Sequence, residues 1–166
     1  MNLFTNFKNK QINFLNKYNF VFVLIVVVTF LLDRISKLKI IDNFYQKTYF
    51  INDYINLDLI WNIGIGFGLL STDSSILYEI MTFFIGSVIL ILIYISLISN
   101  GIEKYVFALV IGGALGNFYD RLVYKAVPDF IDFHIKDFHW FTFNVADIFI
   151  SSGIIVFILK GFFVKN

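Results

Sequence analysis

The sequence predicts an all-α membrane protein, with four transmembrane helices and a small β element in an outer loop. The prediction rests on the composition, on four long apolar stretches and on one short alternating segment. Of the 166 residues, 58% are hydrophobic and 15% are charged, and the mean hydropathy is +0.78. Soluble domains carry about 25% charged residues, and a domain of this size cannot hide so much apolar surface from water. We expect one domain over residues 1–166.

The four apolar stretches each approach the roughly 20 residues that a helix needs to cross a bilayer. They cover about residues 18–41, 76–99, 105–123 and 141–163. The single proline, Pro128, lies outside all four. Because lipid offers the backbone no hydrogen bonds, a spanning segment must pair its own polar groups, and these stretches are predicted to be helices.

The first stretch also has one feature of a secretion signal, since lysines precede its apolar run. Asp33 and Arg34 follow that run without a small-residue cleavage site, so we predict an uncleaved anchor. The leading lysines predict a cytoplasmic N-terminus, and four spans return the C-terminus to the same side. The connections 42–75 and 124–140 then lie outside. Within the first of them, residues 55–59 alternate apolar and polar, which predicts a half-buried strand.

The composition also excludes several classes of function. The 13 basic and 12 acidic residues give a net charge of +1, which provides no basic surface for nucleic acid. The chain has no cysteine, so disulfides and thiol nucleophiles are excluded. Its two histidines, His134 and His139, leave little for a histidine-rich metal site. We expect no metal and no cofactor.

Polar residues inside apolar stretches are costly, so their positions carry functional information. Asp33 and Lys37 are four residues apart near the end of the first stretch, the spacing of a helical ion pair. The alternative is that both side chains extend into the membrane interface. Asn62, Gly64 and the glycines that follow could bind an extended peptide, although a simple turn fits them equally well.

The third stretch combines small and polar residues. Gly112 and Gly116 form a small-xxx-small face on which another helix can pack closely. Asn117 and Arg121 are four residues apart, so they share one helical face near the outer interface. Asp120 is expected to be either the partner of the adjacent Arg121 or a local cap, and not a catalyst. Helix packing with an interfacial ion pair remains the alternative to a functional site.

Two carboxylates stand out near the outer interface. Pro128 disfavours helix in the residue before it, so Asp129 is predicted to lie on an irregular segment near the membrane surface. Asp132 has the character of a solvated surface acid, and an exposed loop charge is the alternative reading for both. Asp147 lies about six residues into the fourth stretch, roughly 9 Å deep. No Lys or Arg follows it before Lys160.

Asn144 and Ser151 extend the polar side of this fourth stretch on either side of Asp147. An unpaired intramembrane aspartate is a functional residue by default. If Asp129 and Asp147 meet, like charge and low dielectric make them share one proton. The ionised carboxylate can then activate water while the protonated one hydrogen-bonds a scissile carbonyl, which is the chemistry of aspartic proteases.

Other functions remain open at this point. A serine mechanism lacks a histidine in the same stretch. A small transporter or ion-site protein could use Asp147, and a lipid-binding scaffold would need no catalysis. Arg121 or Lys37 could balance negative charge in the site or on a lipid headgroup.

Five ordered blocks then resemble one family. They are Asp33-x-x-Ser36-Lys37, Asn62-x-Gly64-x-x-Phe67-Gly68, Gly112-Gly113-x-x-Gly116-Asn117-x-x-Asp120-Arg121, Val127-x-Asp129-Phe130-Ile131 and Phe143-Asn144-x-Ala146-Asp147. Together they resemble bacterial lipoprotein signal peptidase (signal peptidase II), over about residues 18–163. Gly66 and Pro128 depart from the family pattern, which usually has alanine and often valine there.

The resemblance implies an intramembrane aspartic endopeptidase with Asp129 and Asp147 as its catalytic pair. It implies substrates that are diacylglyceryl-modified prolipoproteins, cut just before the lipidated cysteine, and inhibition by globomycin. The expected location is the bacterial plasma membrane, in contact with its lipids, with the active site near the outer face. The resemblance also implies that further residues shape or brace the pocket. Lys37 is added to them because its spacing from Asp33 predicts an ion pair. The full set is Asn62, Gly64, Asn117, Arg121, Asn144, Asp33 and Lys37.

Overall fold

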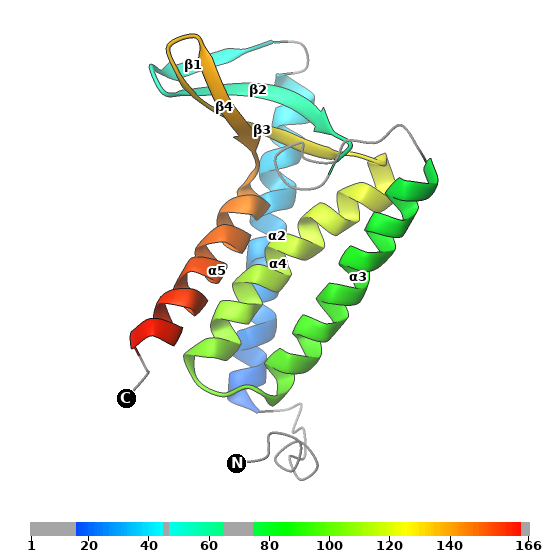
Figure 1. Ribbon diagram of the computed structural model, residues 1–166, viewed down its shortest axis with the longest axis vertical. Helices are drawn as coiled ribbons and strands as arrows, with labels where there is room; N and C mark the ends of the chain where they lie inside the picture. The colour runs from blue at the N-terminus through cyan, green and yellow to red at the C-terminus, as the bar shows by residue number, and fades with distance from the viewer. Residues whose placement is uncertain (1–15, 45–46, 65–74, 164–166) are drawn as a thin grey trace.

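The computed structural model describes residues 16–44, 47–64 and 75–163. In this part of the chain, four long helices form a bundle, and a four-stranded antiparallel sheet lies at one end of it (Figure 1). The helices are α2 (Lys17–Asn43), α3 (Ser75–Ile98), α4 (Ile102–Tyr124) and α5 (Val145–Phe163). Helix α2 starts and α5 ends at the end of the bundle opposite the sheet (Figure 1).

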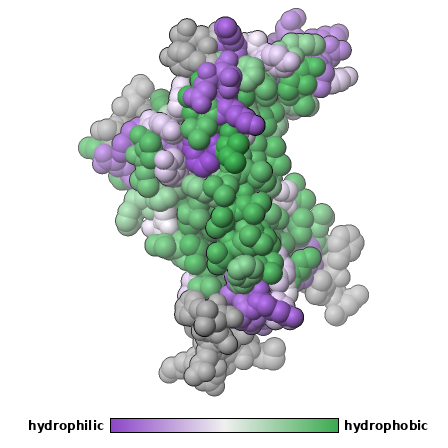
Figure 2. Space-filling view, turned by 180° about the vertical axis from the view of Figure 1, so that it is seen from behind, coloured by the Kyte–Doolittle hydropathy of each residue, from purple (hydrophilic) through white to green (hydrophobic). Residues whose placement is uncertain are grey.

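Three of the described helices, α3, α4 and α5, are long and apolar enough to cross a membrane. Helix α2 is not among them, and its second half carries three buried charged side chains, Asp33, Arg34 and Lys37. The surface between the two ends of the molecule is a broad hydrophobic band, with hydrophilic residues toward each end (Figure 2). Large apolar side chains are exposed along the helices, for example Phe83 of α3 at 78% and Phe162 of α5 at 76%. A continuous apolar surface of this extent marks a protein that is embedded in a membrane.

Helix α4 packs against the three other helices. The predicted close packing at its small residues is confirmed, because a Cβ on Gly112 would meet backbone and side chain of α2, and one on Gly116 would meet the Asp33 side chain. Gly113 makes the same approach to α5, where an added Cβ would lie 2.6 Å from the carbonyl oxygen of Ala146. These glycines let α2 and α5 approach α4 on either side, which brings the polar residues of all three together.

The sheet has the strand order β1-β2-β3-β4, with β1 (Tyr49–Asn52), β2 (Ile55–Asn62), β3 (Val127–Ile135) and β4 (Phe138–Phe143). Strand β2 confirms the predicted strand. The prediction of an irregular segment around Asp129 is wrong, since this residue is the third in β3 and pairs with Ile60. Pro128 is tolerated there because the pairing of β3 with β4 begins only at Ile131, so this end of β3 is an edge on one side.

The predicted start of the fourth span is also wrong. Residues Phe141–Phe143 end strand β4, and α5 begins at Val145. Their apolar character reflects cross-strand aromatic packing, for example between Phe133 and Phe141 at 5.9 Å between ring centroids. Asp147 therefore lies in the first turn of α5 and not six residues into a helix.

Candidate active site

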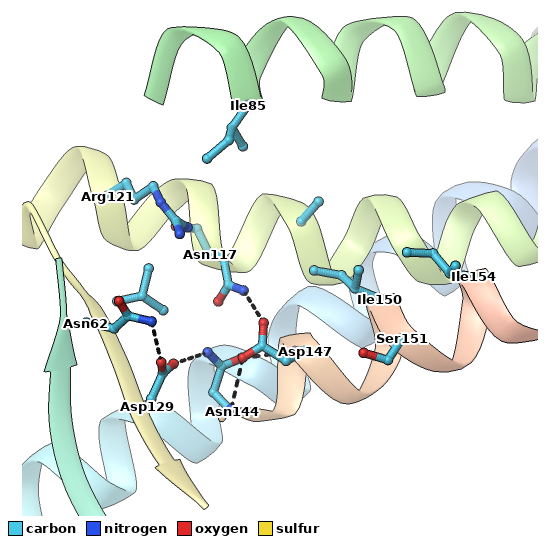
Figure 3. Close-up of a pocket in the computed structure, with 12 residues that line it drawn as sticks. Asn62, Ile85, Asn117, Arg121, Asp129, Asn144, Asp147, Ile150, Ser151 and Ile154 are labelled. Atoms are coloured by element: carbon cyan, nitrogen blue, oxygen red, sulfur yellow. Dashed lines mark hydrogen bonds between the residues drawn. The ribbon is translucent and has the colours of Figure 1, made fainter. Parts of the chain in front are cut away.

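A cavity of about 350 Å³ lies where β2 and β3 meet α3, α4 and α5. Asp129 and Asp147 both line it (Figure 3). Its other lining residues are Asn62, Ile85, Ala114, Asn117, Arg121, Val127, Asn144, Ile150, Ser151 and Ile154. The cavity therefore combines one polar wall, centred on the two carboxylates, with one apolar wall.

Asn144 lies between the two carboxylates and contacts both (Figure 3). Its side-chain Nδ2 donates to Oδ1 of Asp129 at 2.6 Å, and its backbone N–H donates to Oδ2 of Asp147 at 3.1 Å. Its Oδ1 accepts from the backbone N–H of Asp147 at 3.1 Å, an N-cap interaction at the start of α5. One residue at the junction of β4 and α5 thus positions both acids.

A second amide completes the environment of each carboxylate. Asn62 donates from Nδ2 to Oδ2 of Asp129 at 2.8 Å, and Asn117 donates from Nδ2 to Oδ1 of Asp147 at 2.8 Å. All four carboxylate oxygens therefore accept one hydrogen bond each. The acids are held in place by neutral donors, and within the described residues neither carboxylate forms an ion pair with Lys or Arg.

The pKa of Asp129 is raised from 3.8 to about 6. Burial is the main cause, since only 3% of the residue is exposed, and the negative charge of Asp147 adds to it. The hydrogen bonds from Asn62 and Asn144 act in the opposite direction. A carboxyl group with this pKa can take up and release a proton near neutral pH, which is what general acid–base catalysis requires.

Arg121 also reaches the cavity, from the last turn of α4. Its guanidinium donates to the backbone oxygens of Asn117 at 3.1 Å and Gly64 at 3.2 Å. Its Nε is buried and has no hydrogen-bond partner in the described part of the chain. The expected pairing of Arg121 with Asp120 is wrong, because Asp120 forms ion pairs with Arg34 and Lys37 of α2 instead.

A buried ionic cluster lies behind the polar wall and positions it. Lys37 Nζ lies 2.7 Å from Oδ2 of Asp33, 2.7 Å from Oδ2 of Asp120 and 2.7 Å from Oδ1 of Asn117. The side chains of Asp33 and Lys37 are fully buried, so the predicted ion pair is confirmed and interfacial exposure is excluded. Lys37 thereby orients Asn117 toward Asp147.

Asp33 reaches the start of α5 directly. Its Oδ1 accepts a hydrogen bond from the backbone N–H of Ala146 at 3.0 Å. A carboxylate at a helix N-terminus is favourable because it satisfies an unpaired N–H group. Asp33 and Lys37 do not line the cavity, so their role is to position residues that do.

Gly64 is placed beside the site by its backbone, which donates to Oδ1 of Asn62 at 2.8 Å and accepts from Arg121. The rest of the glycine segment, including Gly66 and Gly68, lies outside the described residues.

Asp132 is only 5% exposed and contacts His139 through its carboxylate, so the expectation of a solvated surface acid is wrong.

The apolar wall was missed in the sequence. On α5 it consists of Ile150, three residues after Asp147, and Ile154, four residues after Ile150. That spacing places them on the same helical face as the aspartate, so this part of the wall had a readable signal. Ile85 comes from α3, far away in the sequence, and no local pattern marks it.

The chain is similar to known proteins over most of its length. The family model described as signal peptidase (SPase) II matches residues 25–163. A lipoprotein signal peptidase of Pelagibacter ubique is 48% identical over 158 residues, covering 93% of this chain and 95% of that protein. One from Francisella tularensis subsp. novicida is 38% identical over 126 residues, covering 74% and 78%.

Two solved structures, each described as a bacterial membrane enzyme, have similar folds. One is 29% identical with a TM-score of 0.69 and covers 88% of this chain and 92% of its own. The other is 26% identical with a TM-score of 0.70 and covers 88% and 94%.

Proposed function

The chain belongs to the signal peptidase II family of lipoprotein-processing membrane proteases, and we propose that Asp129 and Asp147 are its catalytic pair. The observation that carries this proposal is the contact of Asn144 with both carboxylates inside one cavity. The raised pKa of Asp129, to about 6, supports it. The transporter alternative draws no support from the family or from its named relatives.

The pair works with one shared proton. The ionised carboxylate removes a proton from a water molecule, whose oxygen attacks the scissile carbonyl carbon, while the protonated carboxyl donates to the carbonyl oxygen. As the tetrahedral intermediate collapses, one of its hydroxyl groups returns a proton to the second carboxylate, the C–N bond breaks, and the leaving amine takes the proton that the first carboxylate accepted. The products are a signal peptide with a new carboxylate and a lipoprotein with a new amino group.

The neighbouring residues have separate roles in this scheme. Asn62, Asn117 and Asn144 fix the carboxylates, and Asp33 and Lys37 fix that frame from behind. Gly64 holds Asn62 through its backbone. Arg121 retains an Nε–H without a partner in the described residues, which makes it the cation available to negative charge in the cavity or on a lipid headgroup.

The substrate is a prolipoprotein, as the family implies, and we infer that it carries a diacylglyceryl group on the cysteine after the cut. The apolar wall, formed by Ile85, Ala114, Ile150 and Ile154, suits chain segments that are partly in lipid. A lipid anchor beside the scissile bond would reduce the entropy lost on binding and hold the bond at the carboxylates. Globomycin is expected to inhibit this cleavage, as the family resemblance implies.

We propose that α2 is a fourth span and that residues 1–166 form one peptidase domain in the bacterial plasma membrane. Its 27 residues rise about 40 Å, enough to cross a bilayer. Apolar side chains on its outer surface are exposed to the surroundings, with Phe20 at 70% and Val23 at 54%. With the leading lysines in the cytoplasm, both termini lie inside and the sheet and cavity lie near the outer face.

The proposal is tested by cleavage of a diacylglyceryl-modified prolipoprotein by purified protein in detergent. Asp129→Asn and Asp147→Asn should each abolish cleavage while the protein remains folded and membrane-inserted. Asp137→Asn is the matched control, because Asp137 is an exposed acid between β3 and β4 that does not line the cavity. Full cleavage by both site variants, or undiminished cleavage by the wild type under globomycin, would refute the assignment.

A further inference from the structure

A second cluster of side chains lies on the sheet, outside the catalytic cavity. It consists of Asp132 and His134 on β3 and His139 on β4, and none of the three lines the cavity. Asp132 and His134 are two residues apart, so they point to the same face of their strand. The β3–β4 register shifts between Phe133 and His134, and this irregularity places His139 opposite His134.

The three potential ligand atoms converge on one point. Oδ2 of Asp132 lies 2.7 Å from Nδ1 of His139 and 3.6 Å from Nδ1 of His134, and one ligand atom from each residue falls within 4.8 Å of the other two. The two imidazole rings are stacked, with centroids 5.3 Å apart and planes 25° apart. Two imidazoles and one carboxylate are a donor set that Zn²⁺ and similar divalent metals prefer.

His134 supplies an independent observation that points to a ligand. The residue is only 6% exposed, and its Nδ1 has no hydrogen-bond partner in the described part of the chain. Its 3.6 Å separation from the carboxylate of Asp132 is too long for a hydrogen bond. Buried polar atoms are almost always satisfied by a partner, a water or an ion, so this nitrogen requires one.

We propose that Asp132, His134 and His139 bind a divalent transition metal ion, Zn²⁺ fitting best, with water completing the coordination. Bond lengths of about 2.0–2.2 Å in a tetrahedral site put ligand atoms about 3.4 Å apart. The pair formed by Asp132 and His134 already has this spacing, whereas the His139 nitrogen must move away from the carboxylate by several tenths of an ångström. The His139 side chain is 58% exposed and free to make that movement.

The site would act on the sheet and not in the reaction itself. A metal bound to both strands would fasten β4 to β3, the strand that holds Asp129 three residues before Asp132. It would therefore stabilise the folded protein by mass action, since it binds the folded chain and not the unfolded one. This inference is independent of the assignment of the catalytic pair.

The test is metal binding by the full-length, metal-stripped protein without an affinity tag, in detergent. Co²⁺ should give the visible absorption of a tetrahedral site, and Zn²⁺, competed against a chromophoric chelator, should displace it at one ion per chain. His139→Ala should weaken binding more than about tenfold, because even an outer-shell partner of a metal ligand is worth that much. His134→Gln should do the same, and Asp137→Asn should bind as the wild type does.

Thermal unfolding gives a second readout. Zn²⁺ should raise the unfolding midpoint of the wild type and of Asp137→Asn but not that of His139→Ala. Prolipoprotein cleavage by metal-free His139→Ala should match the metal-free wild type, which shows that the variant is folded. If the wild type bound no metal at a fixed ratio to the chain, the proposed site would not exist. If His139→Ala and Asp137→Asn bound metal with equal affinity, the metal would bind elsewhere. Either result would overturn the proposal.

Discussion

Asn144 offers the sharpest test of how the site is built, because it performs two separable tasks. As N-cap of α5 it accepts from the backbone N–H of Asp147, and as a donor it holds Asp129 at 2.6 Å. Asn144→Ser keeps a good capping oxygen, whereas Asn144→Ala removes both functions. Comparing the two variants separates helix stability from organisation of the catalytic pair.

The expected magnitudes follow from the contacts. A hydrogen bond to a charged group contributes about 1.5–3 kcal/mol, and each 1.36 kcal/mol in a barrier is about tenfold in rate. Loss of the donor to Asp129 should therefore lower kcat/KM about 10- to 100-fold in both variants. Loss of the cap should destabilise only Asn144→Ala, by about 1 kcal/mol.

The pH dependence of cleavage provides a further signature. The hydrogen bond from Asn144 lowers the pKa of Asp129, which burial and Asp147 hold at about 6. Without this bond the pKa rises further, so the acid limb of the kcat/KM profile should move to higher pH in Asn144→Ser. The assay is lipopeptide cleavage across pH, beside thermal unfolding.

Asn43→Ala is the matched control, because the Asn43 side chain is exposed at the end of α2 and, among the described residues, bonds the backbone oxygen of Lys39 and not a residue of the cavity. It should change neither rate nor profile. Wild-type kcat/KM and an unshifted acid limb in Asn144→Ser would refute the role of the bridging amide.

Three further predictions follow from the packing and the charges. Gly116→Ala should lower the free energy of unfolding by about 1–3 kcal/mol through overpacking, and it should reduce cleavage. Gly161→Ala is the control, because its added Cβ meets open space, and it should change neither quantity. Unfolding and cleavage assays on the two variants test this. Lys37→Met should lower the free energy of unfolding by about 3–5 kcal/mol, because it leaves the buried carboxylate of Asp33 without its cation. The exposed Lys39→Met should have little effect in the same denaturation experiment. The Asp129 carboxyl keeps its proton up to pH about 6 in the folded protein and loses it near pH 3.8 in the unfolded chain. As pH rises through that range, the contribution of this group to the free energy of unfolding should therefore fall by about 3 kcal/mol. Unfolding midpoints measured across pH should show this decline in the wild type and lack it in Asp129→Asn.

Much of the helical architecture could be predicted because apolar length and small-residue spacing are local signals. The packing face at Gly112 and Gly116 follows from the spacing of its small residues, and the strand from Ile55 follows from another local signal, the alternation of apolar and polar residues. The start of α5 was misplaced because residues of β4 are as apolar as a span, and only the pairing with β3 shows that they belong to a sheet.

The charged residues were harder to predict than the helices. Asp120 stands next to Arg121 in the sequence, yet its partners are Arg34 and Lys37 on another helix. Neighbours along a helix point in different directions, and only the packing of α2 on α4 decides which charges meet. The buried state of Asp132 has the same origin, since β2 and β4 pair with its strand on both sides.

The account depends on water, activated by the two aspartates, being the nucleophile that cuts the substrate. Single-turnover cleavage in H₂¹⁸O, followed by mass spectrometry of products and enzyme, tests this directly. The account predicts one ¹⁸O atom in the new carboxylate of the released signal peptide and none in Asp129 or Asp147. Label in either aspartate would mean that the side chain attacked the carbonyl itself, and it would contradict the mechanism.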